Sequence, residues 1–169
     1  MDSDTQRPDV TTNGLDAGWS AGDGWGFVPD DDGFYPAHRD CCFGCGPANH
    51  SGLGLRIRDG AAGDLVCDYS FDDRFAGGPG VAHGGAVAAV LDDVIGAVSL
   101  AHGVPRVTAR IEVDYRSPIA LGQDVTIRAR LVAVAGRKAT VAGEMRDARG
   151  RILAEATAIM VEIDDWRVT

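Results

Sequence analysis

The stretch that decides the fold is GGPGVAHGGAVAAVLDDVIGAVSL, residues 77–100, in which a glycine-rich run leads through one histidine into an apolar segment. Residues 84–100 predict a helix, because the large apolar residues recur at helical spacing. At about 100° per residue these side chains gather on one face, which we expect to pack against a sheet. They are Val87, Val90, Leu91, Val94 and Val98.

Small residues occupy the opposite face of this helix, and a carboxylate stands at its centre. Because small side chains let another chain or a ligand approach closely, we expect Asp92 to lie in a binding site or an interface rather than in solvent. Asp93 is about 100° away, so for this residue solvent or an ion pair is the simpler expectation. The small residues around Asp92 are Gly85, Ala88, Ala89, Gly96 and Ser99.

The turn His83-Gly84-Gly85 places free backbone N–H groups at the start of the helix. Together with the helix dipole, such donors suit a carbonyl oxygen that is becoming an oxyanion. The two glycines allow close approach because they lack a Cβ. His83 is expected to cap or orient the turn or to contact a substrate, and direct proton transfer is its less favoured role.

The spacing between the turn and the carboxylate predicts an oligomer. Gly85 and Asp92 share a face but lie about 10 Å apart along the helix axis. They are therefore too far apart to act on one reacting centre, which needs groups within about 3 Å. Two helices packed antiparallel in a symmetric dimer would bring the glycine turn of one chain near Asp92 of the other, so we expect a homodimer or homotetramer with its site between subunits.

Strand-like runs flank the helix: residues 53–58 and 63–71 precede it, and 106–119, 124–135, 138–148 and 151–163 follow. This order predicts an α+β fold in which an antiparallel sheet lies over one long helix. In the run 106–119, Val107, Ala109, Ile111, Val113 and Tyr115 fall on one face and Thr108 on the other. The last run is apolar on both faces, which predicts that a second protomer covers the sheet.

Charge and composition exclude some classes of function. The 169-residue chain has a net charge of −9, and nine aspartates against two arginines fall within residues 1–40. We expect residues 1–35 to form a flexible acidic tail, in which Trp19, Trp25 and Phe27 could dock, and residues 36–169 to form one domain. No basic stripe indicates nucleic acid, and no signal peptide or apolar run of about 18 residues indicates a membrane, so a cytoplasmic protein is expected.

Cys42-x-x-Cys45 raises the question of zinc. Structural zinc usually takes four ligands, and the further candidates are Cys41, His50 and the distant Cys67. Without a second pair, small buried thiols are the favoured interpretation, and we expect no metal. No glycine-rich loop with a following Gly-Lys-Ser/Thr is present, so no nucleotide loop and no cofactor are expected either.

The segment HGGAVAAVLDD followed by VDYRSPIALGQDVTIRARL resembles the hotdog-fold acyl-CoA thioesterases of the PaaI-like group, as do CFGCGPANHSGLGL (42–55) and DRFAGGPGVAHGG upstream. The resemblance runs from about Cys42 to Ile163. It implies a hotdog fold, in which the sheet wraps around a central helix, assembly into dimers or tetramers, and hydrolysis of an acyl-CoA thioester to free acid and CoA.

By position, the resemblance implies that the Gly84 N–H polarises the thioester carbonyl, that Asp92 is the general base or nucleophile, and that a Thr108 hydroxyl helps to position water. Two departures stand out: Gly77 replaces an Asn or Gln of many relatives, and Gly96 replaces a hydroxyl residue of some. Candidate substrate contacts are the close-approach position Gly85, the amide Asn49, and the CoA-phosphate partners Arg116, Arg137 and Lys138.

Two other functions remain open. The first is a non-catalytic acyl-CoA-binding or regulatory module, which would bind the acyl-CoA ester at the same site without hydrolysing it. An acyl-CoA dehydratase or hydratase is less favoured, because that chemistry normally pairs a catalytic histidine with an acid, and the spacing from His83 to Asp92 fits thioesterases better.

Overall fold

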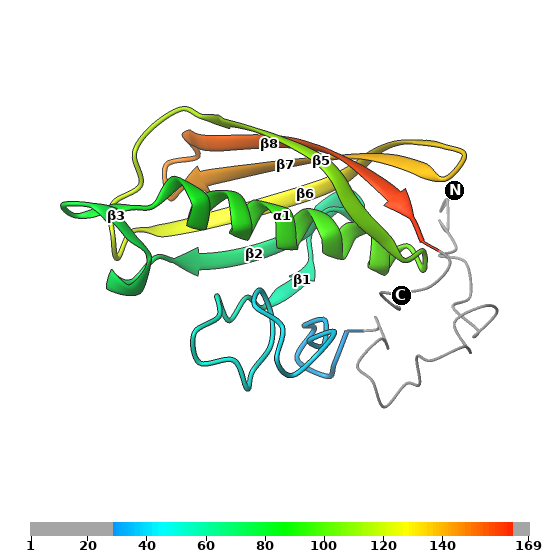
Figure 1. Ribbon diagram of the computed structural model, residues 1–169, viewed down its shortest axis with the longest axis horizontal. Helices are drawn as coiled ribbons and strands as arrows, with labels where there is room; N and C mark the ends of the chain where they lie inside the picture. Colours follow the sequence, from blue (N-terminus) through cyan, green and yellow to red (C-terminus); the bar gives the residue numbers. More distant parts are fainter. Residues whose placement is uncertain (1–28, 164–169) are drawn as a thin grey trace.

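The computed structural model describes residues 29–163, which form one antiparallel sheet wrapped around a long helix (Figure 1). The helix α1, Gly84–Ala101, lies across one face of the sheet. The six strands are ordered β1-β2-β6-β7-β8-β5, so β1 and β5 form the edges. The hotdog fold expected from the sequence is confirmed. The strands are β1 Ile57–Asp59, β2 Leu65–Ser70, β5 Arg106–Tyr115, β6 Asp124–Ala135, β7 Lys138–Asp147 and β8 Ile152–Glu162.

The bulky face of α1 forms the centre of the core, as its spacing predicted. Val90, Leu91, Val94 and Val98 are completely buried. The helix can lie close to the sheet because β7 has Gly143 beneath it, where a Cβ would come within 3.0 Å of the Ile95 side chain. Ser99 differs from its expected position on the accessible small face: it is buried, and its hydroxyl makes no hydrogen bond within the described residues.

Strand β5 does not alternate as predicted. A β-bulge at Ala109 leaves this residue without a partner on β8, because Thr108 pairs with Met160 and Arg110 with Ile159. The extra residue shifts the alternation, so Thr108 faces the helix together with Ile111 beyond the bulge. The prediction that Thr108 and Ile111 lie on opposite faces of this strand was therefore wrong.

Two further differences concern short elements before the helix. Only Ile57 and Arg58 of the expected strand 53–58 pair with β2, in a strand that extends to Asp59. Between β2 and α1, a small hairpin forms from β3, Ala76–Gly78, and β4, Val81–Ala82. This hairpin presses Gly77 against the backbone of His83, where a Cβ would lie 2.6 Å from the His83 Cα. The glycine is thus required by close packing at the helix entrance.

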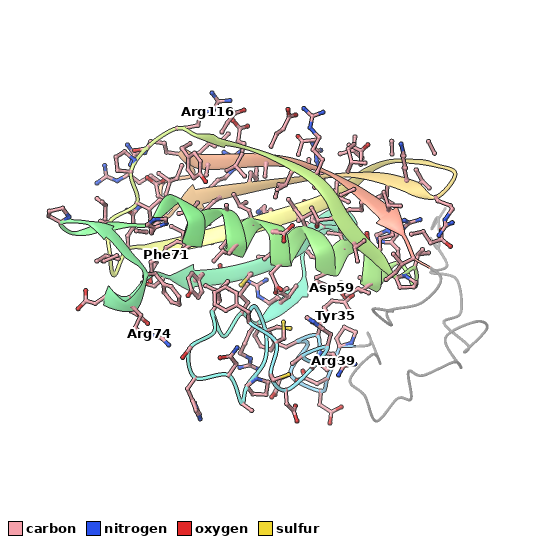
Figure 2. The ribbon with its side chains drawn as sticks, in the orientation of Figure 1. Tyr35, Arg39, Asp59, Phe71, Arg74 and Arg116 are labelled. Carbon is pink, nitrogen blue, oxygen red and sulfur yellow. The ribbon has the colours of Figure 1, made fainter. Side chains whose placement is uncertain are left out.

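The described chain joins the domain before the expected boundary at residue 36. Phe34 forms a bridge to Arg58, and Tyr35 is only 7% exposed. The Tyr35 hydroxyl donates a hydrogen bond of 2.9 Å to Asp59 at the end of β1, where Figure 2 shows the two residues close together. Docking of the segment before residue 36 therefore begins at Phe34. Trp19, Trp25 and Phe27 lie outside the described residues.

Helix α1 is the one described helix whose 18 residues and mean hydropathy of 1.6 match a membrane span. Its buried apolar face and its place inside the sheet identify it as the central helix of the domain core.

Candidate active site

The sequence-predicted carboxylate and hydroxyl meet across the helix and the edge strand. Thr108 Oγ1 donates a hydrogen bond of 2.8 Å to Asp92 Oδ1, and it also lies 3.3 Å from the Met160 sulfur. Asp92 is half-buried, as expected for a residue on the small face of α1. The hydroxyl occupies one carboxylate oxygen and fixes the side chain, which leaves the second oxygen of Asp92 for another partner.

Asp92 and Thr108 open onto a cavity of about 350 Å³ between α1, the start of β5 and the segment 35–57. The cavity also contains the buried Arg106, whose Nε has no hydrogen-bond partner within the described residues. Its guanidinium lies 4.0 Å from Glu162. A largely apolar cavity with a few convergent polar groups is typical of a small-molecule site. The apolar lining comes from Leu55, Ile57, Ala97, Leu100, Val107 and Met160.

The start of the helix offers a second set of groups. His83 Nδ1 accepts a hydrogen bond of 2.9 Å from the Gly85 N–H, so His83 caps the helix. The Gly84 N–H makes no hydrogen bond within residues 29–163, whereas the Gly84 carbonyl accepts one from the Tyr115 hydroxyl at 2.9 Å. The turn 83–85 is exposed. Gly84 is thus the available backbone donor, and Gly85 is committed to the cap.

Gly84 lines its own cavity of about 290 Å³, together with Tyr115 and Arg116. Within one chain it lies about 12 Å from Asp92 along the helix axis, at about 1.5 Å per residue. The single chain therefore does not bring the donor and the carboxylate together. Asp92 and Gly84 each line a separate cavity.

The two adjacent aspartates have different environments. Asp93 is half-buried and lines the same cavity as Asp92, and it makes no ion pair with the described residues, because it lies under the loop that contains the cysteines rather than on the open surface that its position on the helix had suggested. A Cβ on Gly44 would overlap the Asp93 carboxyl group. Burial, and then the negative charge of the neighbouring Cys42, raise the pKa of Asp93 to about 7.

The other residues predicted to contact the substrate lie in different parts of the fold. Both polar atoms of the Asn49 amide bond within its own loop, to Cys41 O and Ser51 N, and Asn49 lines neither cavity. Arg116 lies beside the Gly84 cavity, paired with Glu155 at 2.9 Å and Asp114 at 3.2 Å. Arg137 lies in the turn between β6 and β7 and Lys138 begins β7, at the opposite end of the sheet (Figure 1).

His38 was not predicted as a site residue from the sequence, although it lies beside Cys42 and Cys45, the two cysteines considered as zinc ligands. His38 Nδ1 is 3.1 Å from Cys45 Sγ. The pKa of Cys42 is lowered, first because the Cys45 thiol donates to its sulfur and then because His38 is adjacent. Among the described residues these three converge, while Cys41, His50 and Cys67 do not join them. The spacing His-x3-Cys-x2-Cys was the signal that could have identified the group.

The fold and the site geometry define a hotdog thioesterase-like protein, and comparison with known proteins agrees. The Thioesterase superfamily matches residues 79–154. A phenylacetic acid degradation-related protein from Ralstonia eutropha JMP134 is 32% identical, with a TM-score of 0.60 over 68% of this chain and 89% of that chain. The chain therefore belongs to the Thioesterase superfamily, in its PaaI-like group.

Two further relatives are similar to the chain, one in sequence and one in structure. Acyl-coenzyme A thioesterase THEM4 of Rattus norvegicus is 31% identical over 101 residues, which are 59% of this chain and 44% of that protein. The chain thus spans less than half the length of this curated relative. The PaaI protein of E. coli shares the fold at 18% identity, with a TM-score of 0.61 over 66% of this chain and 80% of that chain.

Proposed function

We propose that the protein hydrolyses an acyl-CoA thioester to free acid and CoA, at a site shared by two copies of the chain. The observation that carries the proposal is the free Gly84 N–H at the exposed start of the helix that also carries the Asp92 carboxylate, about 12 Å away along the axis. Neither cavity holds both groups. Two helices packed antiparallel about a two-fold axis would place Gly84 of one chain beside Asp92 of its partner.

In the proposed reaction, the thioester carbonyl oxygen accepts a hydrogen bond from the Gly84 N–H at the positive end of α1. Asp92 either removes a proton from the attacking water or attacks the carbonyl carbon itself. The Gly84 N–H stabilises the oxyanion that develops until the C–S bond breaks. If Asp92 acts as a base, the departing CoA sulfur takes back the proton that Asp92 removed from water, and the free acid is formed directly. If Asp92 acts as a nucleophile, the CoA thiolate takes a proton from solvent, and water then hydrolyses the acyl–Asp92 anhydride to the free acid and the regenerated carboxylate.

Thr108 orients the carboxylate in this scheme. Its hydroxyl donates to Oδ1 of Asp92 and thereby turns Oδ2 toward the water or the carbonyl carbon. Thr108 was expected to position water directly, whereas its hydroxyl donates a hydrogen bond to Asp92 and so orients the carboxylate. His83 acts by capping the helix, which fixes the turn that presents Gly84.

Basic groups of both chains fit the phosphates of CoA. Arg116 lines the cavity of Gly84, and Arg137 and Lys138 stand at the end of the sheet where β5 begins. Antiparallel packing of two chains would bring these opposite ends toward each other, so that Arg116 of one chain and Arg137 and Lys138 of the other flank the shared site.

Two features of the surface support a homodimer. Strand β5 is an edge of the sheet, with backbone groups that a second chain can pair. The face of α1 around Asp92 has Gly85 exposed and Ala88, Ala89 and Gly96 half-buried, which permits close approach of another helix. Further pairing of dimers through the sheet would give the homotetramer.

The THEM4 relative is named an acyl-coenzyme A thioesterase, which supports the reaction class. The test is a panel of acyl-CoA esters with short, long and aromatic acyl groups, with release of free CoA thiol measured for wild type and Asp92→Asn. We expect turnover by wild type and a loss of at least about 100-fold in the variant. Full activity of Asp92→Asn would refute the mechanism.

The same panel decides between the other two functions. A regulatory module would bind acyl-CoA saturably, measured by calorimetry, without releasing thiol from any ester. A hydratase would instead add water to an enoyl-CoA and leave the thioester intact, which is visible as loss of enoyl absorbance. Either result replaces the proposal of thioester hydrolysis.

A further inference from the structure

Three metal-binding side chains converge beside the Asp92 cavity, outside the groups used in the proposed reaction. One ligand atom each from His38, Cys42 and Cys45 lies within 4.8 Å of the others, and each residue is half-buried. His38 and Cys45 also line the cavity itself. Two cysteines and a histidine supply the sulfur and nitrogen atoms that zinc prefers.

The loop that presents these side chains is held rigidly by its own backbone. The Gly46 N–H donates to Cys42 O at 3.0 Å, and Cys42 Sγ accepts from the Gly44 N–H at 3.3 Å. A Cβ at Gly46 would overlap the backbone of Cys42, so the tight turn requires glycine. The turn is anchored to the next segment by Leu55 N–H, which donates to Gly44 O at 2.8 Å. The arrangement of His38, Cys42 and Cys45 therefore exists without a bound ion.

A candidate for the fourth ligand lies under this turn, although its carboxyl oxygens are not among the ligand atoms that lie within 4.8 Å of one another. The carboxyl group of Asp93 touches Gly44, the residue that precedes Cys45. Asp93 forms no hydrogen bond or ion pair with any part of the chain between residues 29 and 163. A half-buried carboxylate without such a partner is costly when it is ionised, and a bound cation would offset that cost. Asp93 is therefore the candidate for the fourth position, which its carboxyl group would reach by a shift toward the other three ligands.

We propose that His38, Cys42, Cys45 and Asp93 bind one zinc ion. Tetrahedral zinc with bonds of about 2.0–2.3 Å places its ligand atoms about 3.6 Å apart, close to the spacing of the three convergent atoms. The ion would connect segment 38–45 to helix α1, directly next to Asp92. It would hold the wall of the cavity that this segment forms and leave the thioester chemistry to Gly84 and Asp92.

The test measures metal content and does not depend on turnover. The full chain is purified with reductant and without chelator, and zinc is measured by mass spectrometry for wild type, Cys45→Ser and Cys41→Ser. Cys41 is the matched control, because it is an exposed neighbouring cysteine outside the cluster. We expect about one zinc ion per chain in wild type and Cys41→Ser, and loss of zinc in Cys45→Ser.

Cobalt provides a second readout on the wild-type chain, which avoids any dependence on the folding of variants. Stripped protein titrated with Co²⁺ is expected to show the thiolate charge-transfer and visible bands of a tetrahedral sulfur-containing site. In competition with a chelating dye, Asp93→Asn is expected to bind zinc at least about tenfold more weakly.

Three results would overturn the proposal. Reduced wild type could take up neither zinc nor cobalt. Cys41→Ser could lose zinc as completely as Cys45→Ser, which would place the metal elsewhere. Finally, a Cys42–Cys45 disulfide could form in place of metal binding, with no zinc uptake after its reduction, which would assign the pair to thiol chemistry.

Discussion

Thr108 Oγ1 donates a hydrogen bond of 2.8 Å to Asp92 Oδ1, which ties the edge strand β5 to the central helix. The two residues are far apart in the sequence and belong to elements that the core holds in fixed positions. A carboxylate restrained in this way keeps one orientation, so its second oxygen has a defined direction.

Thr108→Val keeps the shape of the side chain and removes this bond. Because a hydrogen bond to a charged group contributes about 1.5–3 kcal/mol, we expect kcat to fall by roughly 10- to 100-fold. KM should change little, since Thr108 acts through Asp92. Steady-state kinetics on the best acyl-CoA ester measure both constants, and Thr108→Ser, which keeps the hydroxyl, is the control. Equal rates for the two variants would disprove the positioning role.

Gly84→Pro removes one N–H and keeps the helix start. Proline is compatible with the first helical position, and the extended backbone of His83 suits a residue before proline. We expect a loss of about 100- to 1,000-fold in kcat. Gly84→Ala retains the donor, and its Cβ would lie 3.6 Å from the Tyr115 ring, an ordinary contact. Circular dichroism checks the fold, and an active proline variant would exclude this donor.

A mixture of Gly84→Pro and Asp92→Asn chains tests whether the site is shared. Random reassociation gives half heterodimers, in each of which one of the two sites contains both Gly84 and Asp92. Activity should therefore recover to roughly a quarter of wild type, although each variant alone is inactive. The measurement is thiol release after unfolding and refolding the two chains together. No recovery, with heterodimers demonstrated by native mass spectrometry, would place both groups within one chain.

Gly77→Ala tests the close packing at the helix entrance. The added Cβ would meet the His83 backbone, which cannot move without disturbing the cap. Overpacking of this kind costs about 1–3 kcal/mol, so the midpoint of thermal unfolding should drop by several degrees. In Gly78→Ala the Cβ would lie 3.4 Å from a flexible Val81 side chain, so little change is expected there. Equal stability of both variants would contradict the packing argument.

Asp68 on β2 gives the stability a dependence on pH. The hydrogen bond from Thr126, and then Arg58, lower the pKa of Asp68 below its unfolded value, so the ionised form stabilises the fold above about pH 4. This contribution disappears as the pH falls through the folded pKa. Because the side chain is mostly exposed, Asp68→Asn should lower the free energy of unfolding at pH 7 by less than about 1 kcal/mol.

Urea unfolding at pH 7 and at about pH 3 measures this difference. Asp124→Asn on the adjacent strand is the control, since Asp124 makes no side-chain hydrogen bond or ion pair in the described part of the chain. A deficit of Asp68→Asn that stays the same at both pH values would show that the ionised carboxylate is not its cause.

Local periodicity was enough to predict the helix, its buried face and the main strands, because each depends on residues close in sequence. It could not reveal the bulge at Ala109, since an unpaired residue appears only against the partner strand β8. The partial burial of Asp93 depends on a loop about fifty residues earlier in the chain. His38 could not be predicted for the same reason, because only the fold of that loop brings it next to Cys45.

The bulge in β5 has a consequence for solubility. A flat edge strand can recruit further strands without limit, which leads to fibres. At Ala109 the regular ladder of β5 is interrupted, and the opposite edge, β1, has only three residues and is bridged by Phe34. Neither end of the sheet offers a long uninterrupted template, so growth by edge addition is discouraged while closed two-fold pairing stays possible.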